Sequence, residues 1–515
     1  MRASSPRPTR LLDVTDNSSP RPAPDLSRLI KAYDVRGLVP DEFSPEVARA
    51  IATAFAEIVV KDAAEARERD EGVPTRPRVA IGQDMRESGG PLVEAFSSGL
   101  TERGVDVVRI GLCSTDGLYH ASGALDIPGA MFTASHNPAE YNGIKMCHAG
   151  ARPVGQGSGL DAIRDLATRY LNDGLPDPVE TPGEVSERQM LGEYAAFLRT
   201  LVDLRGIRPL KVVVDAGNGM AGLTAPAVLG TAAGLEPLRL DVVPLYFELD
   251  GTFPHHEANP LEPANLRDLQ AAVVEHGADI GLAFDGDADR CFVIDERGEP
   301  VSPSAITALV GLREVARETA AGRSSTVIHN LITSRVVPDL LQAAGARTVR
   351  TRVGHSFIKA QMAEHEAVFG GEHSAHYYFR DFFYADTGML AAMHVLAALG
   401  EARGSDGAPV PLSLLAEAYE PYVASGEMNS RVEDVEAARE RVVEAYVTQQ
   451  GGGPVEVDEL DGLTVSHWDA HPRWWFNLRA SNTEPLLRLN VEAADEDIMV
   501  KVRDDVLALV RQGQE

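Results

Sequence analysis

The chain has 515 residues, of which 44% are hydrophobic and 24% charged, and 77 acidic against 48 basic side chains give a formal net charge of −29. This length exceeds what one hydrophobic core holds, so we expect three or four domains. The acidic field argues against nucleic acid and anionic membrane surfaces as partners. Three scattered cysteines and no apolar run of membrane-spanning length point to a reducing cytoplasm.

A unit of strand, helix and strand recurs three times. The copies begin at Arg78, Lys211 and Ser325, and each has an apolar β-rich run, a polar loop, a helical stretch and a glycine before the second strand. Such a unit forms a right-handed crossover between parallel strands, with ligand-binding loops at the carboxyl ends of the strands. Residues 1–27, rich in Arg, Pro and Ser, are expected to form a disordered arm.

The last hundred residues follow a different pattern. A linker-like segment at 404–409 precedes alternating short strands such as 486–491 and an amphipathic helix from Asp495. The predicted fold class is α/β, with three similar mixed-sheet α/β domains and a C-terminal α+β domain. The expected divisions are the arm at 1–27 and domains at 28–180, 181–298, 299–408 and 409–515.

The first segment with reactive groups, in chain order, lies in the first copy of the unit. Asn137 and Pro138 force a turn, so we expect Ser135 to be exposed on a tight loop at a strand end, with Lys145 ten residues later. A phosphorylated serine would be stabilised there by a lysine and a metal ion. A lone serine in a turn is more often a capping residue, so this interpretation depends on the other motifs.

The second copy carries a glycine pattern that favours another class of protein. Gly217, Gly219 and Gly222 follow a strand and open a helical stretch, and Asp241 ends the next strand, as in the dinucleotide fingerprint. This is the best argument for an NAD-dependent oxidoreductase. The same unit recurs at 78 and 325 without those glycines, so we favour a repeated scaffold whose middle copy has a tight turn.

Three aspartates alternate with small residues between two apolar runs. Alternate residues of an extended segment point the same way, so Asp285, Asp287 and Asp289 can converge on one divalent cation. An EF-hand is rejected because that loop requires glycine where Arg290 stands. An acidic turn without metal is the plainer alternative.

Two later segments offer groups that bind sugars and phosphate. Glu372 and Ser374 can accept hydrogen bonds from sugar hydroxyls, and His376 can exchange a proton with the hydroxyl that gains or loses phosphate. The segment 479–485 supplies a guanidinium, two hydroxyls and an amide that suit a phosphate bound without reaction, with Arg488 as a supporting group. Surface histidines and a turn cluster are the corresponding structural alternatives.

These four segments, in this order and one in each predicted domain, resemble those of the α-D-phosphohexomutases, most of all the bacterial phosphomannomutase/phosphoglucomutase group. The resemblance runs from about Lys31 to the C-terminus. It implies four domains around a central cleft and an enzyme that interconverts hexose 6-phosphate and hexose 1-phosphate of mannose, glucose or both. It also implies a phosphoserine, Mg²⁺ as cofactor, hexose 1,6-bisphosphate as intermediate and activator, and hexose phosphates as the small-molecule partners.

The resemblance also implies roles for residues at matching positions. The implied catalytic residues are Ser135, Lys145, His376 and Arg36. The implied metal ligands are Ser135, Asp285, Asp287 and Asp289. The implied substrate-binding residues are Tyr33, Arg290, His355, Lys359, Glu372, Ser374, Arg479, Ser481, Asn482 and Thr483. One departure is Leu331, where some relatives carry a lysine that contacts the substrate.

Other functions stay open on the sequence. The motifs do not settle between mannose and glucose, which differ in an axial or equatorial 2-hydroxyl group. A phosphoglucosamine mutase is the nearer enzymatic alternative. A non-catalytic sugar-phosphate sensor is disfavoured, since Ser135 and the three aspartates are intact. The oxidoreductase is the remote alternative, and the sequence does not distinguish a monomer from a dimer.

Overall fold

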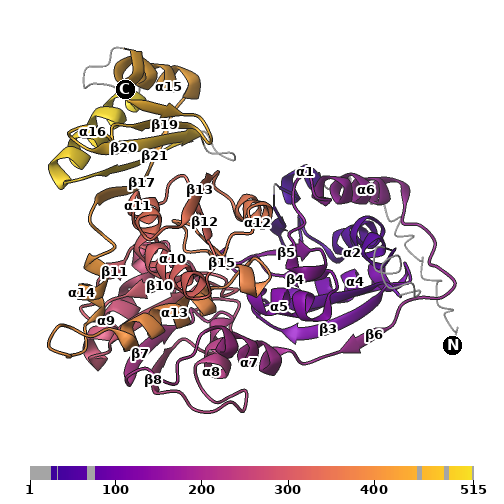
Figure 1. The fold of residues 1–515 in the computed structure, drawn as a ribbon. Coiled ribbons are helices and arrows are strands. Elements are labelled where there is room, and N and C mark those ends of the chain that lie inside the picture. Colours follow the sequence, from indigo (N-terminus) through magenta and orange to yellow (C-terminus); the bar gives the residue numbers. More distant parts are fainter. Residues whose placement is uncertain (1–24, 32, 66–75, 449–454, 481–485, 513–515) are drawn as a thin grey trace, which may run out of the picture.

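The computed structural model describes residues 25–31, 33–65, 76–448, 455–480 and 486–512, except for the side chains of residues 355 and 356. Most of the expected arm at 1–27 lies outside these residues, and its end enters the short helix α1 (Leu26–Leu29). The fold comprises three mixed sheets with helices and one antiparallel sheet (Figure 1). This confirms the predicted fold class.

The three mixed sheets share one strand arrangement. In the first, β2 (Arg78–Gln83) lies between the parallel strands β3 (Asp106–Leu112) and β4 (Gly129–Phe132), and β5 (Tyr141–Cys147) runs antiparallel beside β4. The second sheet repeats this with β7 (Leu210–Asp215), β8 (Leu240–Leu245), β9 (Ile280–Phe284) and β10 (Cys291–Ile294). The third does so with β12 (Thr326–Asn330), β13 (Arg347–Thr351), β14 (Phe369–Gly371) and β15 (Tyr377–Phe379). The predicted threefold repeat is therefore confirmed.

Helices cross over between the parallel strands. The first domain has α2 (Pro45–Phe55) with a π-helical turn (Ala56–Val60), α4 (Gly89–Thr101), α5 (Thr115–Leu125), a 3₁₀ turn (Ala149–Ala151) and α6 (Leu160–Asp173). The second has α7 (Leu191–Leu201), α8 (Ala221–Val228), a 3₁₀ turn (Pro263–Leu266) and α9 (Arg267–His276). The third has α10 (Pro303–Ala320), α11 (Val336–Ala343), α12 (His355–Glu364), a 3₁₀ turn (Arg380–Phe382), α13 (Gly388–Glu401) and α14 (Leu412–Glu417). None of the described helices is both long and apolar enough to cross a bilayer.

Short edge strands complete the mixed sheets and cross two expected divisions. They are β1 (Val35–Leu38) and β6 (Val185–Glu187) in the first sheet, β11 (Pro300–Val301) in the second and β16 (Ala385–Asp386) in the third. β6 belongs to the first sheet although it follows residue 180, and β11 belongs to the second sheet although it follows residue 298. The helix α14 also packs on the core of the middle domains although it follows residue 408. The expected divisions themselves stay predictions.

The C-terminal domain is an antiparallel sheet with helices on one face. Its strands lie in the order β17 (Val423–Arg431), β21 (Leu486–Ala493), β20 (Trp474–Ala480), β19 (Leu463–Ser466) and β18 (Glu456–Asp458). Its helices are α15 (Val435–Val443), with a following π-helical turn (Glu444–Thr448), and α16 (Glu496–Arg511). Asp495 starts α16 by accepting a hydrogen bond from the Ile498 amide at 3.0 Å.

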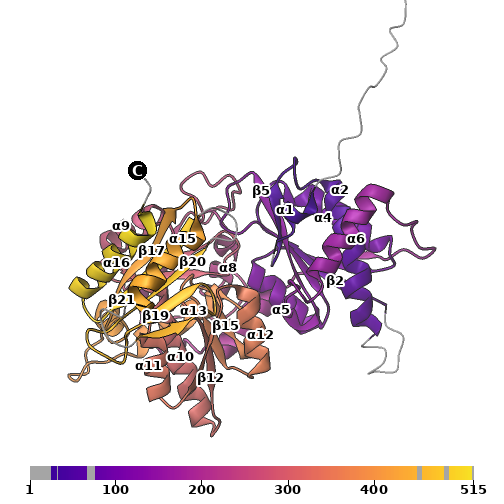
Figure 2. The same ribbon diagram turned by 90° about the horizontal axis from the view of Figure 1, so that it is seen from above.

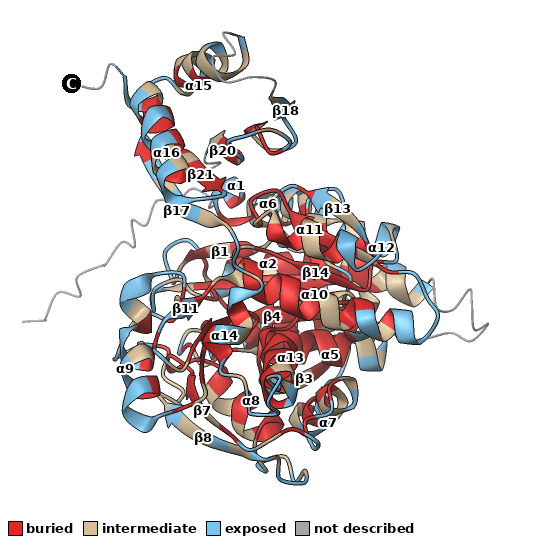
Figure 3. Cartoon of the chain, turned by 60° about the vertical axis from the view of Figure 1, so that its left-hand side comes forward, coloured by how far each residue is buried: buried red, intermediate tan, exposed pale blue. Residues whose placement is uncertain are grey.

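The buried cores show which parts form single bodies. The second and third domains share one continuous core, in which α13 is almost wholly buried (Figure 3). The first and the C-terminal domains each have a core of their own, and Figure 2 shows the first domain on one side of the other three.

Candidate active site

The three central motifs occupy equivalent places in the repeated fold. Each lies in the hairpin loop between the third and fourth strands of its unit: the β4–β5 loop (133–140), the β9–β10 loop (285–290) and the β14–β15 loop (372–376). Each loop also holds one non-glycine residue in the left-handed region, namely Ser135 at φ 50°, Ala288 at φ 59° and Ala375 at φ 64°. This conformation costs about 1–2 kcal/mol per residue, so the surrounding contacts must hold the loops in place.

Ser135 lies where the first two of these loops touch. Its Oγ donates to Asp285 Oδ2 at 2.8 Å, and its amide donates to Thr133 Oγ1 at 2.9 Å. A Cβ added to Gly286 would lie 2.4 Å from the Ser135 carbonyl oxygen, so only glycine permits this approach. Ser135 is 4% exposed. The expectation of an exposed serine was wrong, because a loop from another domain covers it.

Arg86 fixes the backbone of the β4–β5 loop. Its buried guanidinium donates to the carbonyl oxygens of Ser135 (2.9 Å), Asn137 (2.7 Å), Pro138 (2.7 Å) and Tyr141 (3.0 Å). The neighbouring Asp84 pairs with Arg86 Nε at 3.2 Å. Charge-assisted bonds are the stronger kind, so this one side chain holds the strained serine loop from beneath.

Lys145 joins the first domain to the aspartates of the second. Its Nζ lies 2.7 Å from Asp287 Oδ2 and 2.5 Å from Asp289 Oδ2, and Thr115 Oγ1 donates to Asp287 Oδ2 at 2.6 Å. Burial lowers the pKa of Lys145, but the carboxylates raise it more, so the lysine is held charged. Burial and the charge of Asp287 raise the pKa of Asp289 to about 7.

The aspartates of the β9–β10 loop fit a divalent cation. One oxygen from each of Asp285, Asp287 and Asp289 lies within 4.8 Å of the others. The Oδ1 atoms of Asp287 and Asp289 are buried and have no hydrogen-bond partner among the described residues. Lys145 and Arg290 offset two of the three negative charges. The remaining charge and the orphaned hard oxygen atoms are what Mg²⁺ or Ca²⁺ requires.

The third loop meets the second through the backbone and through a histidine. Arg290 and His376 form an isolated β-bridge. His376 Nδ1 lies 3.0 Å from Asp386 Oδ2 and 3.8 Å from Asp289 Oδ1. Burial lowers the pKa of His376, but Asp289 and Asp386 raise it more. The buried Lys359 lies 2.6 Å from Asp386 Oδ1, so Asp386 serves both His376 and Lys359.

Glu372 is held rigidly at the start of the β14–β15 loop. Its Oε1 accepts from the Tyr378 hydroxyl at 2.5 Å, and its Oε2 accepts from Asn330 Nδ2 and Ser374 Oγ, both at 3.3 Å. Arg290 donates from Nε to Asp285 Oδ2 at 2.9 Å, while its buried Nη2 has no partner in the described part of the chain. Fixed carboxylate oxygens and a spare guanidinium donor suit a hydroxylated or anionic ligand.

The N-terminal motif brings the first domain to the third. The Tyr33 ring lies 6.0 Å from that of Phe357, and a Cβ on Gly354 would lie 2.7 Å from the Tyr33 hydroxyl oxygen. Arg36 donates to Asn137 Oδ1 and to Asp34 Oδ2, each at 2.6 Å. Tyr33 therefore lies against the 354–357 segment and Arg36 against the serine loop. The structure does not describe the side chain of His355, so its predicted contact stays a prediction.

The C-terminal domain contributes two arginines. Arg479 on β20 and Arg488 on β21 are cross-strand neighbours, and both pair with Glu427 on β17. Ser481, Asn482 and Thr483 lie outside the described residues, so their predicted places stay predictions.

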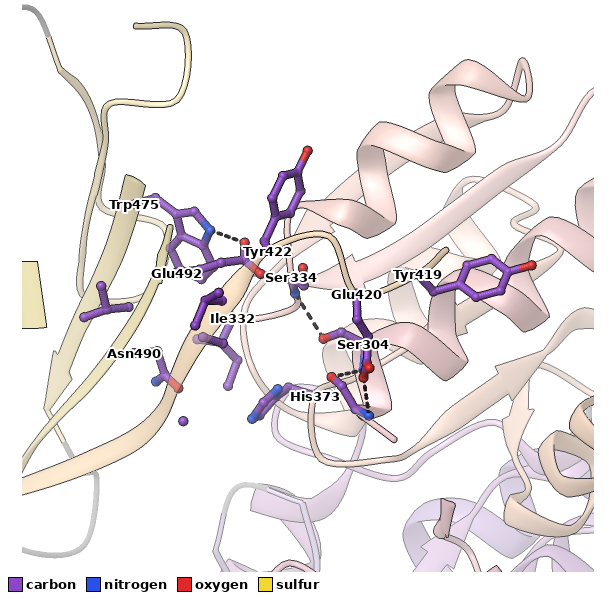
Figure 4. Close-up of a pocket in the computed structure, with 15 residues that line it drawn as sticks. Ser304, Ile332, Ser334, His373, Tyr419, Glu420, Tyr422, Trp475, Asn490 and Glu492 are labelled. Atoms are coloured by element: carbon purple, nitrogen blue, oxygen red, sulfur yellow. Dashed lines mark hydrogen bonds between the residues drawn. The ribbon is translucent and has the colours of Figure 1, made fainter. Parts of the chain in front are cut away.

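A cavity of about 370 Å³ separates this domain from the third (Figure 4). Glu492 anchors the interface, since its Oε2 accepts from the Arg335 amide at 2.9 Å and from Trp475 Nε1 at 2.7 Å. The described lining holds the carboxylates of Glu420 and Glu492 but no lysine or arginine. This cavity therefore lies at the junction of the third and C-terminal domains and has two acidic groups in its described lining.

The glycine pattern of the second repeat serves internal packing. A Cβ on Gly219 would lie 2.7 Å from the Gly286 carbonyl oxygen, and one on Gly222 would lie 2.2 Å from the Phe247 carbonyl oxygen. The Met220 amide donates to the Gly286 carbonyl at 2.9 Å. These glycines let their loop support the β9–β10 loop, which removes the main reason for a dinucleotide site.

Three supporting residues escaped the sequence analysis. Arg86 follows the end of β2, where ligand loops are expected, and that position was the available signal. Thr115 and Asp386 carry no local signal, because their partners lie 172 and 10 residues away in the chain.

Comparisons with known proteins find the same family along nearly the whole chain. Four family models match in order: phosphoglucomutase/phosphomannomutase alpha/beta/alpha domain I at 27–172, domain II at 192–298, domain III at 302–422 and the C-terminal domain at 427–509. Phosphohexose mutases of Xanthomonas campestris pv. campestris are 37% identical over 487 residues, 94% of this chain and 99% of theirs. A phosphomannomutase of Salmonella typhimurium is 37% identical over 94% of this chain and 98% of its own. The crystal structure of a phosphoglucomutase/phosphomannomutase family protein of Burkholderia thailandensis superposes with a TM-score of 0.77 at 29% identity, covering 94% of this chain and 98% of that one.

Proposed function

The chain belongs to the phosphoglucomutase/phosphomannomutase family and is a hexose phosphate mutase, and we propose that Ser135 carries the phosphoryl group that it moves between the first and sixth oxygen atoms of the sugar. The observation that carries the proposal is the convergence at Ser135 of loops from different domains. Its Oγ contacts Asp285 at 2.8 Å, and Lys145 binds the two other aspartates of that loop.

The proposed reaction is two phosphoryl transfers with one reorientation between them. In the first, the bond from phosphorus to Ser135 Oγ breaks as phosphorus bonds to the free hydroxyl oxygen of a hexose monophosphate, and that hydroxyl loses its proton to a base. The resulting 1,6-bisphosphate turns in the site. Its other phosphoryl group then returns to Ser135, and the oxygen that it leaves regains a proton.

Two residues divide the proton and charge chemistry in this proposal. His376 is the proton carrier, because Asp386 fixes its Nδ1 and thereby the direction of its ring. Lys145 is a fixed positive charge, since its carboxylate partners keep it protonated. Arg36 holds the β4–β5 loop through Asn137, two residues after Ser135. Burial of Ser135 keeps water from intercepting the phosphoryl group.

Mg²⁺ is the cofactor that we propose for the β9–β10 loop. Asp285, Asp287 and Asp289 would hold it together with an oxygen of phosphorylated Ser135, and the bound ion would stabilise the negative charge of the phosphoryl group. The orphaned Oδ1 atoms of Asp287 and Asp289 support this assignment.

The other predicted residues bind the sugar and its second phosphate. Glu372 accepts hydrogen bonds from sugar hydroxyls, and Ser374 accepts or donates them, with Tyr33, Arg290 and His355 beside these two residues. Arg479, Ser481, Asn482 and Thr483 form the distal phosphate clamp. Lys359 keeps its predicted substrate contact, and its ion pair with Asp386 at 2.6 Å adds a supporting role.

The test is the Ser135→Ala variant of the full chain. The wild-type protein should show an added mass of one phosphoryl group and convert mannose 1-phosphate or glucose 1-phosphate, whereas the variant should lose both the mass and nearly all turnover. Near-normal turnover in the variant would refute the proposal. Rates on the 1-phosphates of mannose, glucose and glucosamine then decide the substrate. The relatives named phosphomannomutase favour mannose, and fastest turnover of glucosamine 1-phosphate would favour the alternative.

A further inference from the structure

Two arginines of the C-terminal sheet face one another across neighbouring strands. Arg479 and Arg488 are directly opposed in the β20–β21 ladder, where like charges repel. The carboxylate of Glu427 lies between them: its Oε2 accepts from Arg479 Nη2 at 2.6 Å and its Oε1 from Arg488 Nη1 at 3.3 Å. One carboxylate therefore serves two guanidinium groups, and a net positive charge remains.

The arginines keep unused donors. The Nε atoms of Arg479 and Arg488 are both buried, and neither has a hydrogen-bond partner among the residues that the structure describes. A carboxylate has two oxygen atoms and one negative charge, whereas a phosphate group has more of both. A phosphate would thus satisfy this pair of guanidinium groups better than Glu427 does.

An irregularity in the backbone of β17 places Glu427 between the two arginines. The pairing of β17 with β21 shifts register between Ala424 and Glu427, and Gly426 adopts φ 69° within that irregularity. Such a bulge changes the direction of the side chain that follows it. Gly426, the residue before Glu427, lines the same cavity as His373, so this part of β17 lies near the β14–β15 loop. Glu427 itself is an exposed residue.

We propose that Glu427 occupies the anion position between Arg479 and Arg488 until the substrate phosphate displaces it. This inference rests on the proposed function, in which Arg479 binds the phosphate that does not react. A clamp that binds by exchange holds phosphate less tightly than two bare arginines would. That weakening has a use in a mutase, because the bisphosphate must leave the clamp and turn between the two transfers.

The test is binding of inorganic phosphate to the full-length Glu427→Gln variant by calorimetry without divalent cation. Removing the competing charge should tighten binding about tenfold relative to wild type. The control is Glu433→Gln, which removes the same charge from an exposed position of the same domain and should change binding by less than about twofold. Adding Arg479→Met to Glu427→Gln should abolish the gain, which locates it at the clamp.

Steady-state kinetics supply a readout that a purely structural ion pair would not give. Glu427→Gln should lower KM for the hexose 1-phosphate and lower kcat as well, because the bisphosphate is released more slowly from the clamp. Phosphate binding that is unchanged or weaker in Glu427→Gln would overturn the inference. If that variant does not fold, Glu427→Asp, which keeps the charge but shortens the side chain, should bind phosphate more tightly than wild type, and equal binding would overturn the inference. Phosphate binding needs no turnover, so the result is independent of Ser135→Ala.

Discussion

Replacement of Gly286 by alanine tests the contact on which the active site depends. The new Cβ would lie 2.4 Å from the Ser135 carbonyl oxygen, and real Cβ contacts below 3.0 Å are essentially unknown. The β4–β5 and β9–β10 loops must therefore separate by at least roughly 0.6 Å, which costs about 1–3 kcal/mol in a well-packed interior. The neighbours of Gly286 are Asp285 and Asp287, so the same shift disturbs the proposed metal ligands and the serine together.

The expected result is a loss of kcat by about 100-fold, because displacements approaching 1 Å cost that much in a pre-organised site. The assay is conversion of mannose 1-phosphate at saturating Mg²⁺, with unfolding followed in parallel. Gly90→Ala is the matched control, since a Cβ there meets nothing within 4 Å and α4 gains a better helix former. If Gly286→Ala kept kcat within about threefold of wild type with unchanged stability, the two loops would not be in this contact and the site as described would be wrong.

Three further outcomes follow from the same structure. Burial raises the pKa of Asp116 from 3.8 to about 6 despite hydrogen bonds from Ser114, Thr387 and Tyr194, so its contribution to stability is present below pH 4 and lost as pH rises through 6. Relative to Asp116→Asn, the wild-type protein should lose about 3 kcal/mol of unfolding free energy between pH 4 and 7, measured by urea unfolding, and parallel pH profiles would contradict this. Asp386→Asn should lower kcat about 100-fold because it frees the His376 ring, and it should also destabilise the fold because the buried Lys359 loses its ion-pair partner. Adding Lys359→Met should restore stability but not kcat, and a restored kcat would show that the role of Asp386 is only structural. Mg²⁺ at 100 times its Kd should stabilise the wild-type protein by about 2.7 kcal/mol, and an equal gain in Asp285→Asn would place the ion elsewhere.

The repeated fold was predictable because its signals are local. Runs such as Val212–Val214, the glycine before each second strand and the capping residue Asp495 mark strands and helices through side-chain volume, backbone freedom and hydrogen bonds within a few residues. The convergence of the aspartate triad was predicted from its alternation, but the structure achieves it with a turn that has Ala288 at φ 59° rather than with an extended segment. Ser135 was predicted to carry the phosphoryl group from its own motif together with the other three motifs in the chain, but its burial was not predicted.

The sequence by itself therefore determined the strand and helix units, the class of fold and the side chains able to do the chemistry. Only the tertiary structure decided which of them meet. The contact of Ser135 with Gly286, the support of the serine loop by Arg86 and the pairing of Arg479 with Glu427 all join residues that are about 50 or more positions apart. Such contacts depend on how sheets and domains stack, and no local pattern of apolar and polar residues encodes that arrangement.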